Sequence, residues 1–228
     1  MPGLKAIAIT INSQLEPANV LKAAADFANI HGIRHQEIEY DPLQDPVFIS
    51  NPENRCYHCK LNILRMLWDY AYKNGFKTVL DGENADDLNY YRPGHAAKLE
   101  TGTISPLAKH GFTKDEIRIL SKQLGLSTWD KPSAPCLATR FPYRATITQQ
   151  ALEKISRAEA YLNEKGFHDV RVRYYGDLAR IEVNSGEFQK ILDQREELTA
   201  FIKQLGFLHI ALDLTGYRSG SLDEGLIK

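Results

Sequence analysis

Three cysteines are the residues of this chain with the most specific chemistry. Cys56 and Cys59 lie in the stretch ENRCYHCK, with the C-x-x-C spacing of metal sites and redox pairs, and Cys136 lies in the later stretch PSAPCLATR. Three thiolates that converge leave an open position, as in an iron–sulfur cluster whose fourth iron takes an outside ligand. The spacing also leaves open a zinc site completed by His58 or another histidine, or ordinary thiols of which Cys136 packs inside.

A pair of arginines in the stretch VRVRYYGDLARIEV is the second candidate site. Strand alternation places Arg171 and Arg173 on one face and the intervening valines on the other. Beyond a tight turn at Gly176, Arg180 and Glu182 point to the same face as the two arginines. Two guanidinium groups on a rigid strand suit a phosphate. From the pattern alone, however, we favour a solvated face of a small sheet.

The acidic stretch DGENADD follows a predicted strand and is a candidate magnesium site. Ligands of parallel sheets bind beyond the carboxyl ends of the strands, and Mg²⁺ prefers a few carboxylates together with phosphate and water. The carboxylates of this stretch are Asp81, Glu83, Asp86 and Asp87. The alternative is a polar loop in which Asn84 or Asp81 caps the next helix.

Arg218 lies near the C-terminus in GYRSGSLDEG, where its small neighbours favour contact with an anion. A flexible tail is the alternative, and from this stretch alone we favour it. The chain contains neither the phosphate loop G-x-x-x-x-G-K-S/T nor the dinucleotide fingerprint G-x-G-x-x-G.

The elements that must position these residues alternate between strand and helix in the first part of the chain. A helix-capping box, T-K-D-E, begins at Thr113, and its helix ends at Gly125. The alternation predicts a parallel α/β sheet. Strands are expected at 5–10 (a buried type), 33–40 and 76–80, and helices at 17–31 and 56–74.

The pattern changes near Thr148, where a second domain is expected to begin. The order helix, strand, strand, helix, strand predicts a small α+β domain with an antiparallel sheet. We therefore divide the chain into an α/β domain at 1–130, an ordered linker at 131–147 that carries Cys136, and an α+β domain at 148–228. The elements of the second domain are a helix at 149–165, strands at 169–175 and 178–183, a helix at 187–203 and a strand at 209–213.

The overall composition excludes several classes of protein. The chain of 228 residues has 28 basic and 29 acidic residues, so that net charge exerts no pull toward nucleic acid. No apolar stretch approaches a membrane span, and the N-terminus lacks the architecture of a signal peptide. Three cysteines cannot all pair within one chain, which favours reduced thiols and a cytoplasmic protein.

Taken together, these stretches resemble the LarE-type ATP-dependent sacrificial sulfur transferases of the PP-loop ATP pyrophosphatase superfamily. The resemblance runs in the family's order from about residue 5 to the C-terminus. It implies a parallel-sheet domain like those of the adenine nucleotide alpha hydrolases, followed by the small α+β domain. The matching stretches are ENRCYHCK, DGENADDLNYYRPG, TKDEIRILSKQLGLSTWDKPSAPCLATRFPY, VRVRYYGDLARIEV and LDLTGYRSGSLDE.

The resemblance implies an enzyme that uses ATP and Mg²⁺ to adenylate a carboxylate of a pyridinium dicarboxylate mononucleotide. Sulfur transfer then gives the thiocarboxylate precursor of the nickel-pincer nucleotide cofactor. One version of the family sacrifices the sulfur of a lone cysteine at the position of Cys136. In the other version three cysteines hold a 4Fe-4S cluster, and Cys56, Cys59 and Cys136 match it. His58 is then a neighbour rather than a ligand, and a homo-oligomer is expected.

The resemblance also assigns roles to charged residues, and it replaces the solvated-face interpretation of the hairpin. Cys136 with Glu159 and Glu182 would form the sulfur-transfer site. The expected ligands of the substrate phosphate are Arg171, Arg173 and Arg218, and the expected contacts to the nucleotide cofactor are Asp81, Asn84, Asp87 and Arg140.

One motif of the family has no counterpart in this chain, namely the S-G-G-x-D-S loop that cradles the pyrophosphate of ATP. The resemblance therefore implies a domain without its first strand, and weak ATP binding by this chain alone. Three explanations compete for the missing loop. In the first, the chain is a fragment or has a misassigned start. In the second, a separate polypeptide supplies the loop, and in the third the protein has lost adenylation. A PP-loop tRNA thiolase and a non-catalytic iron–sulfur or zinc protein are the alternative functions.

Overall fold

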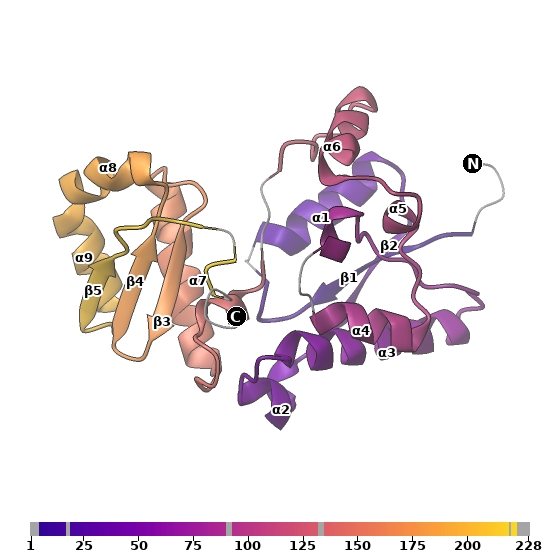
Figure 1. The fold of residues 1–228 in the computed structure, drawn as a ribbon, viewed down its shortest axis with the longest axis horizontal. Helices are drawn as coiled ribbons and strands as arrows, with labels where there is room; N and C mark the ends of the chain where they lie inside the picture. Colours follow the sequence, from indigo (N-terminus) through magenta and orange to yellow (C-terminus); the bar gives the residue numbers. More distant parts are fainter. Residues whose placement is uncertain (1–4, 17–18, 90–92, 132–134, 219, 223–228) are drawn as a thin grey trace. The chain divides into compact units, whose positions relative to one another are not determined.

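The computed structural model describes residues 5–16, 19–89, 93–131, 135–218 and 220–222, and it shows an α/β protein made of two compact units (Figure 1). The segment predicted as a linker at 131–147 enters the second unit at Ala134, and its Leu137 and Phe141 are buried there. The first unit comprises Met1–Asn12, Ala24–Pro42 and Pro52–Ser133, and the second comprises Ser13–Ala23, Leu43–Asn51 and Ala134–Lys228.

The first unit contains a parallel pair of strands, as the alternating pattern predicts. β1 (Ala8–Asn12) pairs with β2 (His35–Glu39), and Ala8 lies opposite His35. The connection between them is α1 (Asn19–Ile30), which is the crossover helix that a parallel pair requires. A strand forms near the predicted range 5–10, but the prediction that it is buried was wrong, because every residue of β1 is half-buried or exposed. In the described parts of the chain β1 pairs with β2 alone, whereas buried parallel strands have neighbours on both edges.

The strand predicted at 76–80 is not formed. Leu80 makes an isolated parallel bridge to Ile104, in which Asp81 N donates to Ile104 O at 3.0 Å and Ile104 N donates to Val79 O at 3.1 Å. The apolar run is present, but a ladder needs a neighbour that continues over several residues. Leu80 remains 59% exposed as a result.

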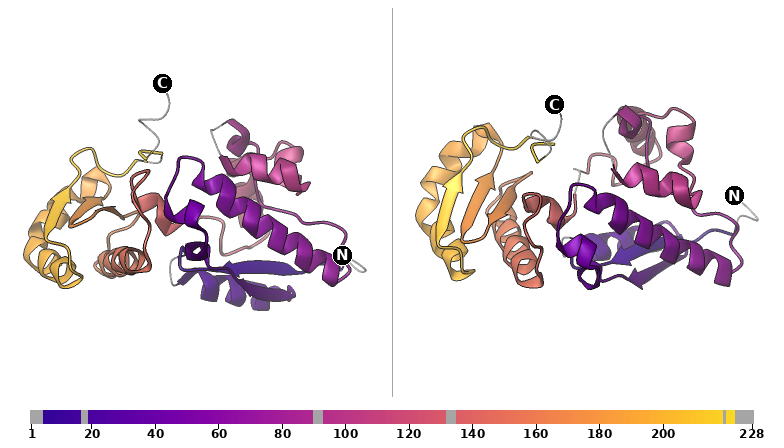
Figure 2. Two further views of the ribbon diagram at one scale, coloured as in Figure 1. Left: turned by 90° about the horizontal axis from the view of Figure 1, so that it is seen from below. Right: turned by 60° about the horizontal axis from the view of Figure 1, so that its bottom comes forward.

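The helices of the first unit are the elements that the sequence predicted most closely. α3 (Arg55–Lys73) packs beside α4 (Pro93–Thr101), and Figure 2 shows the two helices together. The predicted capping box at Thr113 is confirmed at the start of α6 (Lys114–Gln123). Gly125 ends this segment with φ of 71°, a backbone conformation that favours glycine. The shorter elements are η2 (Asp86–Asn89) and α5 (Pro106–Lys109).

The second unit has the predicted order of helix, strand, strand, helix and strand, with two differences. The sheet is mixed, because β4 pairs antiparallel with β3 but parallel with β5. The helix predicted at 187–203 is divided at Gln194 into two helices. The elements are η1 (Pro42–Gln44), α2 (Pro46–Ile49), η3 (Leu137–Arg140), α7 (Gln149–Glu164), β3 (Arg171–Tyr175), β4 (Leu178–Glu182), η4 (Ser185–Glu187), α8 (Phe188–Asp193), α9 (Arg195–Gln204) and β5 (His209–Leu212).

An apolar core fills the space between this sheet and its helices. α7 contributes Leu162, the strands contribute Val172 and Ile181, and α9 contributes Ile202, all of them buried. The opposite face of β3 and β4 carries charged residues, as strand alternation requires. The core thus fixes the two strands from one side and leaves the other side for a site. Among the described helices, none has the length and apolar composition that crossing a bilayer requires.

Candidate functional site

Charged side chains gather on the face of β3 and β4 that lies opposite the core. The strand register places Arg171 opposite Glu182 and Arg173 opposite Arg180, so the alternation predicted from the sequence is confirmed. Arg171, Arg173 and Glu182 are each at least 93% buried, since their exposed fractions are 7%, 6% and 1%. Charges this deeply buried require partners, because an unpaired buried charge is strongly destabilising. The face is therefore a built polar site.

Arg173 is held by a bidentate ion pair to Glu182. Its Nε and Nη2 donate to the two carboxylate oxygens at 2.9 and 2.8 Å, a planar geometry in which both hydrogen bonds are strong. The same guanidinium donates from Nη1 to the carbonyl of Thr139 at 2.7 Å and from Nη2 to Ser221 Oγ at 2.8 Å. Arg173 thus connects β3 to the segment of Cys136 and η3, called the Cys136 loop below, and to the C-terminal segment at Ser221.

Arg140 forms a second bidentate pair, with Glu159 of α7. Its Nε and Nη2 donate to the two oxygens at 2.8 Å each, and Glu159 Oε1 also accepts the backbone N–H of Val172 at 2.8 Å. From Nη1 the same side chain donates to the carbonyls of Pro135 and Cys136 at 2.9 and 3.2 Å. These contacts fasten the Cys136 loop to β3, the strand that carries Arg171 and Arg173.

Arg171 and Arg218 are placed differently from Arg173. Arg171 donates to the carbonyl of Val170 at 2.7 Å, and its guanidinium lies 4.8 Å from the centre of the Tyr217 ring. Burial, followed by the nearby positive charge of Arg140, lowers the pKa of Arg171 from its ordinary value. An anion near this guanidinium would relieve both effects. Arg218 is exposed.

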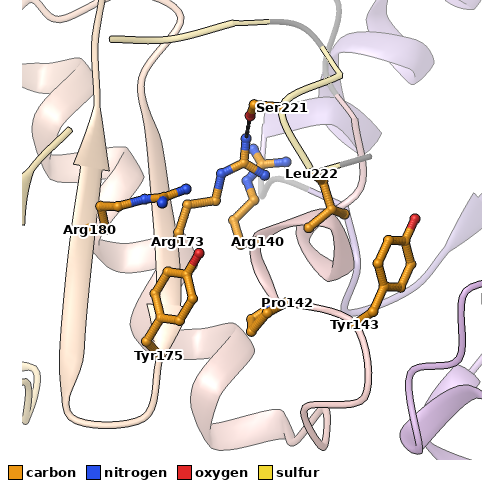
Figure 3. Close-up of a pocket in the computed structure, with 8 residues that line it drawn as sticks. All are labelled: Arg140, Pro142, Tyr143, Arg173, Tyr175, Arg180, Ser221 and Leu222. Carbon is orange, nitrogen blue, oxygen red and sulfur yellow. Dashed lines mark hydrogen bonds between the residues drawn. The ribbon is translucent and has the colours of Figure 1, made fainter. Parts of the chain in front are cut away.

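A pocket of about 190 Å³ opens beside these arginines (Figure 3). Three guanidinium groups line it, and no carboxylate does among the residues that the structure describes. Figure 3 shows Arg140 and Arg173 next to each other, with Ser221 above and the ring of Tyr175 below. Such a lining fits an anion that also carries a flat ring. The lining residues are Arg140, Pro142, Tyr143, Arg173, Tyr175, Arg180, Ser221 and Leu222.

The three cysteines are divided between the two units. Cys56 is exposed and Cys59 half-buried in the first two turns of α3, in the first unit. Cys136 is half-buried in the second unit, where it directly precedes η3. Each of the three is a thiol rather than half of a disulfide. His58, which lies between Cys56 and Cys59 in the sequence, has its Nε2 3.2 Å from Asn54 Nδ2.

The acidic stretch DGENADD forms a polar loop whose carboxylates have partners within the first unit. Asp81 pairs with Lys60 at 3.0 Å, and buried Glu83 pairs with buried Lys98. Asn84 Oδ1 accepts the N–H groups of Asp86 and Asp87 at 3.0 and 3.3 Å, which is the capping role considered as the alternative. Within the described parts of each unit, no three His, Cys, Asp or Glu side chains are grouped as metal ligands. Magnesium binding by this loop stays a prediction.

The residues of the predicted site belong to two different units of the structure. Cys136, Glu159 and Glu182 lie in the second unit with the arginines, whereas Cys56 and Cys59 lie in the first. Arg140, predicted to act with Asp81, Asn84 and Asp87, belongs to the second unit, while those three belong to the first. The lining residues Tyr175 and Ser221 were not predicted. Alternation could have identified Tyr175, because it follows Arg173 by two positions on the same strand.

Comparison with known proteins gives three relatives, two of which match nearly the whole chain. An uncharacterised protein of Synechocystis is 42% identical over 99% of this chain and 85% of its own length. The pyridinium-3,5-bisthiocarboxylic acid mononucleotide synthase of Lactiplantibacillus plantarum is 35% identical over 97% of this chain and 80% of its own length. An uncharacterised protein of Methanocaldococcus jannaschii is 35% identical over 75% of this chain and 67% of its own length. No family model matches the chain.

Proposed function

Because this chain belongs to the LarE family, that of the pyridinium-3,5-bisthiocarboxylic acid mononucleotide synthase, we propose that it transfers sulfur to a carboxylate of a pyridinium dicarboxylate mononucleotide. The observation that carries this proposal is the arginine-lined pocket next to the Cys136 loop. The substrate would present a phosphate and carboxylates, and guanidinium groups recognise both kinds of anion. The product would be a thiocarboxylate, used in the biosynthesis of the nickel-pincer nucleotide cofactor.

The reaction requires activation of the carboxylate, since its oxygen is a poor leaving group. A carboxylate oxygen attacks the α-phosphorus of ATP, the bond to the bridging oxygen breaks, and pyrophosphate leaves together with Mg²⁺. A sulfur nucleophile then attacks the acyl carbon of the acyl-adenylate, and AMP leaves with the electron pair of the broken bond. No atom is oxidised or reduced in these two steps.

Three cysteines would supply the sulfur site, and their chemistry fits a cluster. All three are thiols, and none is fully buried. A 4Fe-4S cluster held by Cys56, Cys59 and Cys136 would offer a transferable sulfur atom at its open iron and allow repeated turnover. In the sacrificial alternative, Sγ of Cys136 attacks the acyl carbon. Loss of the Cα proton then breaks the Cβ–Sγ bond, which leaves the thiocarboxylate and dehydroalanine.

The charged residues of the second unit bind and orient in this proposal. Arg171 and Arg173 bind the substrate phosphate, joined by Arg218. Glu159 and Glu182 act as positioning residues, because both carboxylates are occupied by bidentate pairs with Arg140 and Arg173. The Arg140 contact to the carbonyl of Cys136 orients the loop that carries the thiol.

Anaerobic reconstitution tests the sulfur site. After incubation with iron and sulfide, we expect about four irons per chain, the content of one cluster. Changing any one of the three cysteines to Ala should abolish this iron content, whereas His58→Ala should preserve it. One tightly bound zinc per chain would contradict the cluster. Loss of the elements of H₂S at Cys136, after incubation with ATP and substrate, would instead establish the sacrificial route.

ATP binding tests the activation step. The chain lacks the S-G-G-x-D-S loop, so we expect weak binding of ATP and Mg²⁺ to this chain alone in calorimetry. Addition of a polypeptide that carries the loop should raise the affinity if the loop acts from a separate chain. Tight binding by the 228-residue chain would show that other residues hold the triphosphate.

A further inference from the structure

Arg180 and Tyr175 form one side of the pocket, and the proposed function gives neither residue a role. Both line the pocket, and the guanidinium carbon of Arg180 lies 5.2 Å from the centre of the Tyr175 ring. Tyr175 is 43% exposed and the side chain of Arg180 is 34% exposed, in contrast to Arg173, whose side chain is 8% exposed. This pair is therefore the accessible wall of the pocket, whereas Arg173 is its inner wall.

The donor groups of Arg180 are only partly used by the protein. Its Nη2 donates to Glu182 Oε1 at 2.8 Å, and its Nε lies 3.5 Å from Asp213 Oδ2. Nη1 makes no hydrogen bond to any residue within the described ranges. Since a guanidinium carries five N–H groups, both N–H groups of Nη1 remain for a ligand. The two carboxylates fix the orientation of the side chain without exhausting its donors.

We propose that Arg180 and Tyr175 form a second anion subsite, which holds the non-reacting carboxylate of an aromatic dicarboxylate. This inference rests on the proposed function, because that substrate carries two ring carboxylates, of which only one reacts at a time. The planar guanidinium matches a planar carboxylate, and the Tyr175 ring offers a flat surface to the aromatic ring that bears it. Arg180 and Tyr175 would then decide specificity for a dicarboxylate over a monocarboxylate.

The division of the pocket supports a carboxylate at this wall. A phosphate is tetrahedral and is suited by donors from several directions. Arg173, a phosphate ligand in the proposed function, lies on the inner side of the pocket, which Arg140 and Ser221 also line. Arg180 approaches from the neighbouring strand, beside an aromatic ring. Glu182 does not oppose an anion here, because it is paired with both Arg173 and Arg180.

A comparison of two mononucleotides tests the subsite in the full chain. Calorimetry would measure the affinities of the pyridinium-3,5-dicarboxylate and the pyridinium-3-carboxylate mononucleotides, and of inorganic phosphate. Wild type should prefer the dicarboxylate. Arg180→Ala should reduce affinity for the dicarboxylate about 10- to 100-fold, the range for one charge-assisted contact, and should remove the preference. Affinity for the monocarboxylate and for phosphate should change little.

Further variants separate this role from a structural one. Arg180→Lys keeps the charge near Glu182 but loses the planar fork, so it should recover only part of the preference. Tyr175→Phe should retain the preference and Tyr175→Leu should weaken it. Arg195→Ala is the matched control. Arg195 is exposed on α9, and within the described chain its ion pair is with the exposed residue Glu196. Thermal melts of every variant establish that it is folded.

Two results would overturn the subsite while leaving the proposed function intact. The first is a preference for the dicarboxylate that Arg180→Ala does not change. The second is an equal loss of affinity for inorganic phosphate, which would assign Arg180 to the phosphate. If folded wild type binds neither mononucleotide, the proposed function fails and the subsite fails with it.

Discussion

The second unit buries a continuous apolar core, whereas the first unit leaves many of its apolar side chains in solvent. In the second unit, α7, α8 and α9 cover one face of a three-stranded sheet. In the first unit, a small cluster of Leu61, Leu64 and Ala97 lies between α3 and α4. Large apolar residues of the first unit that remain exposed include Ile30, Tyr72, Leu80, Leu99, Ile104, Ile119 and Leu124.

The contrast follows from the kind of sheet in each unit. A mixed sheet with helices on one face completes its core with three strands and leaves its other face for polar residues. A parallel sheet is buried on both faces and needs several strands, but within the described chain β1 and β2 form a pair and Leu80 forms a single bridge. The comparison therefore predicts a stable second unit and a first unit of low local stability.

The largest effect is expected from Phe207→Ala in the second unit. The Phe207 side chain is 1% exposed and packs edge-on against Tyr174. Its removal should cost about 4 kcal/mol, because a cavity forms in a closed core. Circular dichroism during urea unfolding measures this loss.

A matched variant and a second signal sharpen the comparison. Leu99→Ala in the first unit should cost less than about 0.5 kcal/mol, since Leu99 is 68% exposed. Both tryptophans, Trp68 and Trp129, lie in the first unit, so their fluorescence reports on that unit. Equal costs for the two variants would contradict the difference between the units.

The next effect is expected from Lys98→Met in the first unit. Lys98 and Glu83 form a buried pair, and burial lowers the pKa of Lys98. Removing the lysine leaves a buried carboxylate with His95 at 3.3 Å as its remaining ion-pair partner, which should cost about 3 kcal/mol. Tryptophan fluorescence during urea unfolding measures the cost. The double variant with Glu83→Leu should recover most of the loss, and failure to recover would show that the pair itself stabilises this unit.

A smaller effect is expected from Thr113→Ala. Thr113 Oγ1 accepts the N–H of Glu116 at 3.3 Å, and Glu116 Oε2 accepts the N–H of Thr113 at 2.9 Å. Loss of this cap should cost about 1 kcal/mol, measured by urea unfolding followed by tryptophan fluorescence. Thr113→Ser keeps the hydroxyl and serves as the control. A serine variant as unstable as the alanine variant would contradict the capping role.

The smallest effect is expected from acid. The N–H and the hydroxyl of Thr113 lower the pKa of Glu116 below 4.5, so the folded state binds fewer protons than the unfolded state near that pH. The stabilisation that the Glu116 carboxylate gives the folded state is therefore complete above pH 4.5. It is lost as the pH falls through the folded-state pKa of Glu116. The difference in stability between wild type and Thr113→Ala should therefore narrow in acid. A difference that widens would contradict the assignment.

Local signals in the sequence predicted the elements that depend on nearby residues. The helix beginning at Arg55 and the capping box at Thr113 are confirmed, because both depend on contacts within a few positions. The strand at 76–80 could not be predicted in this way, since a strand exists only with a partner that continues beside it. The parallel pairing of β5 with β4 likewise depends on distant residues.

The sequence by itself determined that Arg171, Arg173, Arg180 and Glu182 share one face, because side chains alternate along any strand. It also predicted that the three cysteines are reduced thiols, as they are in the structure. Only the tertiary structure decided that Glu182 holds Arg173 and that Glu159 holds Arg140 and, through it, the Cys136 loop. Which carboxylate pairs with which arginine depends on how segments distant in the sequence pack together. Burial then requires the pair, because an unpaired buried charge is strongly destabilising.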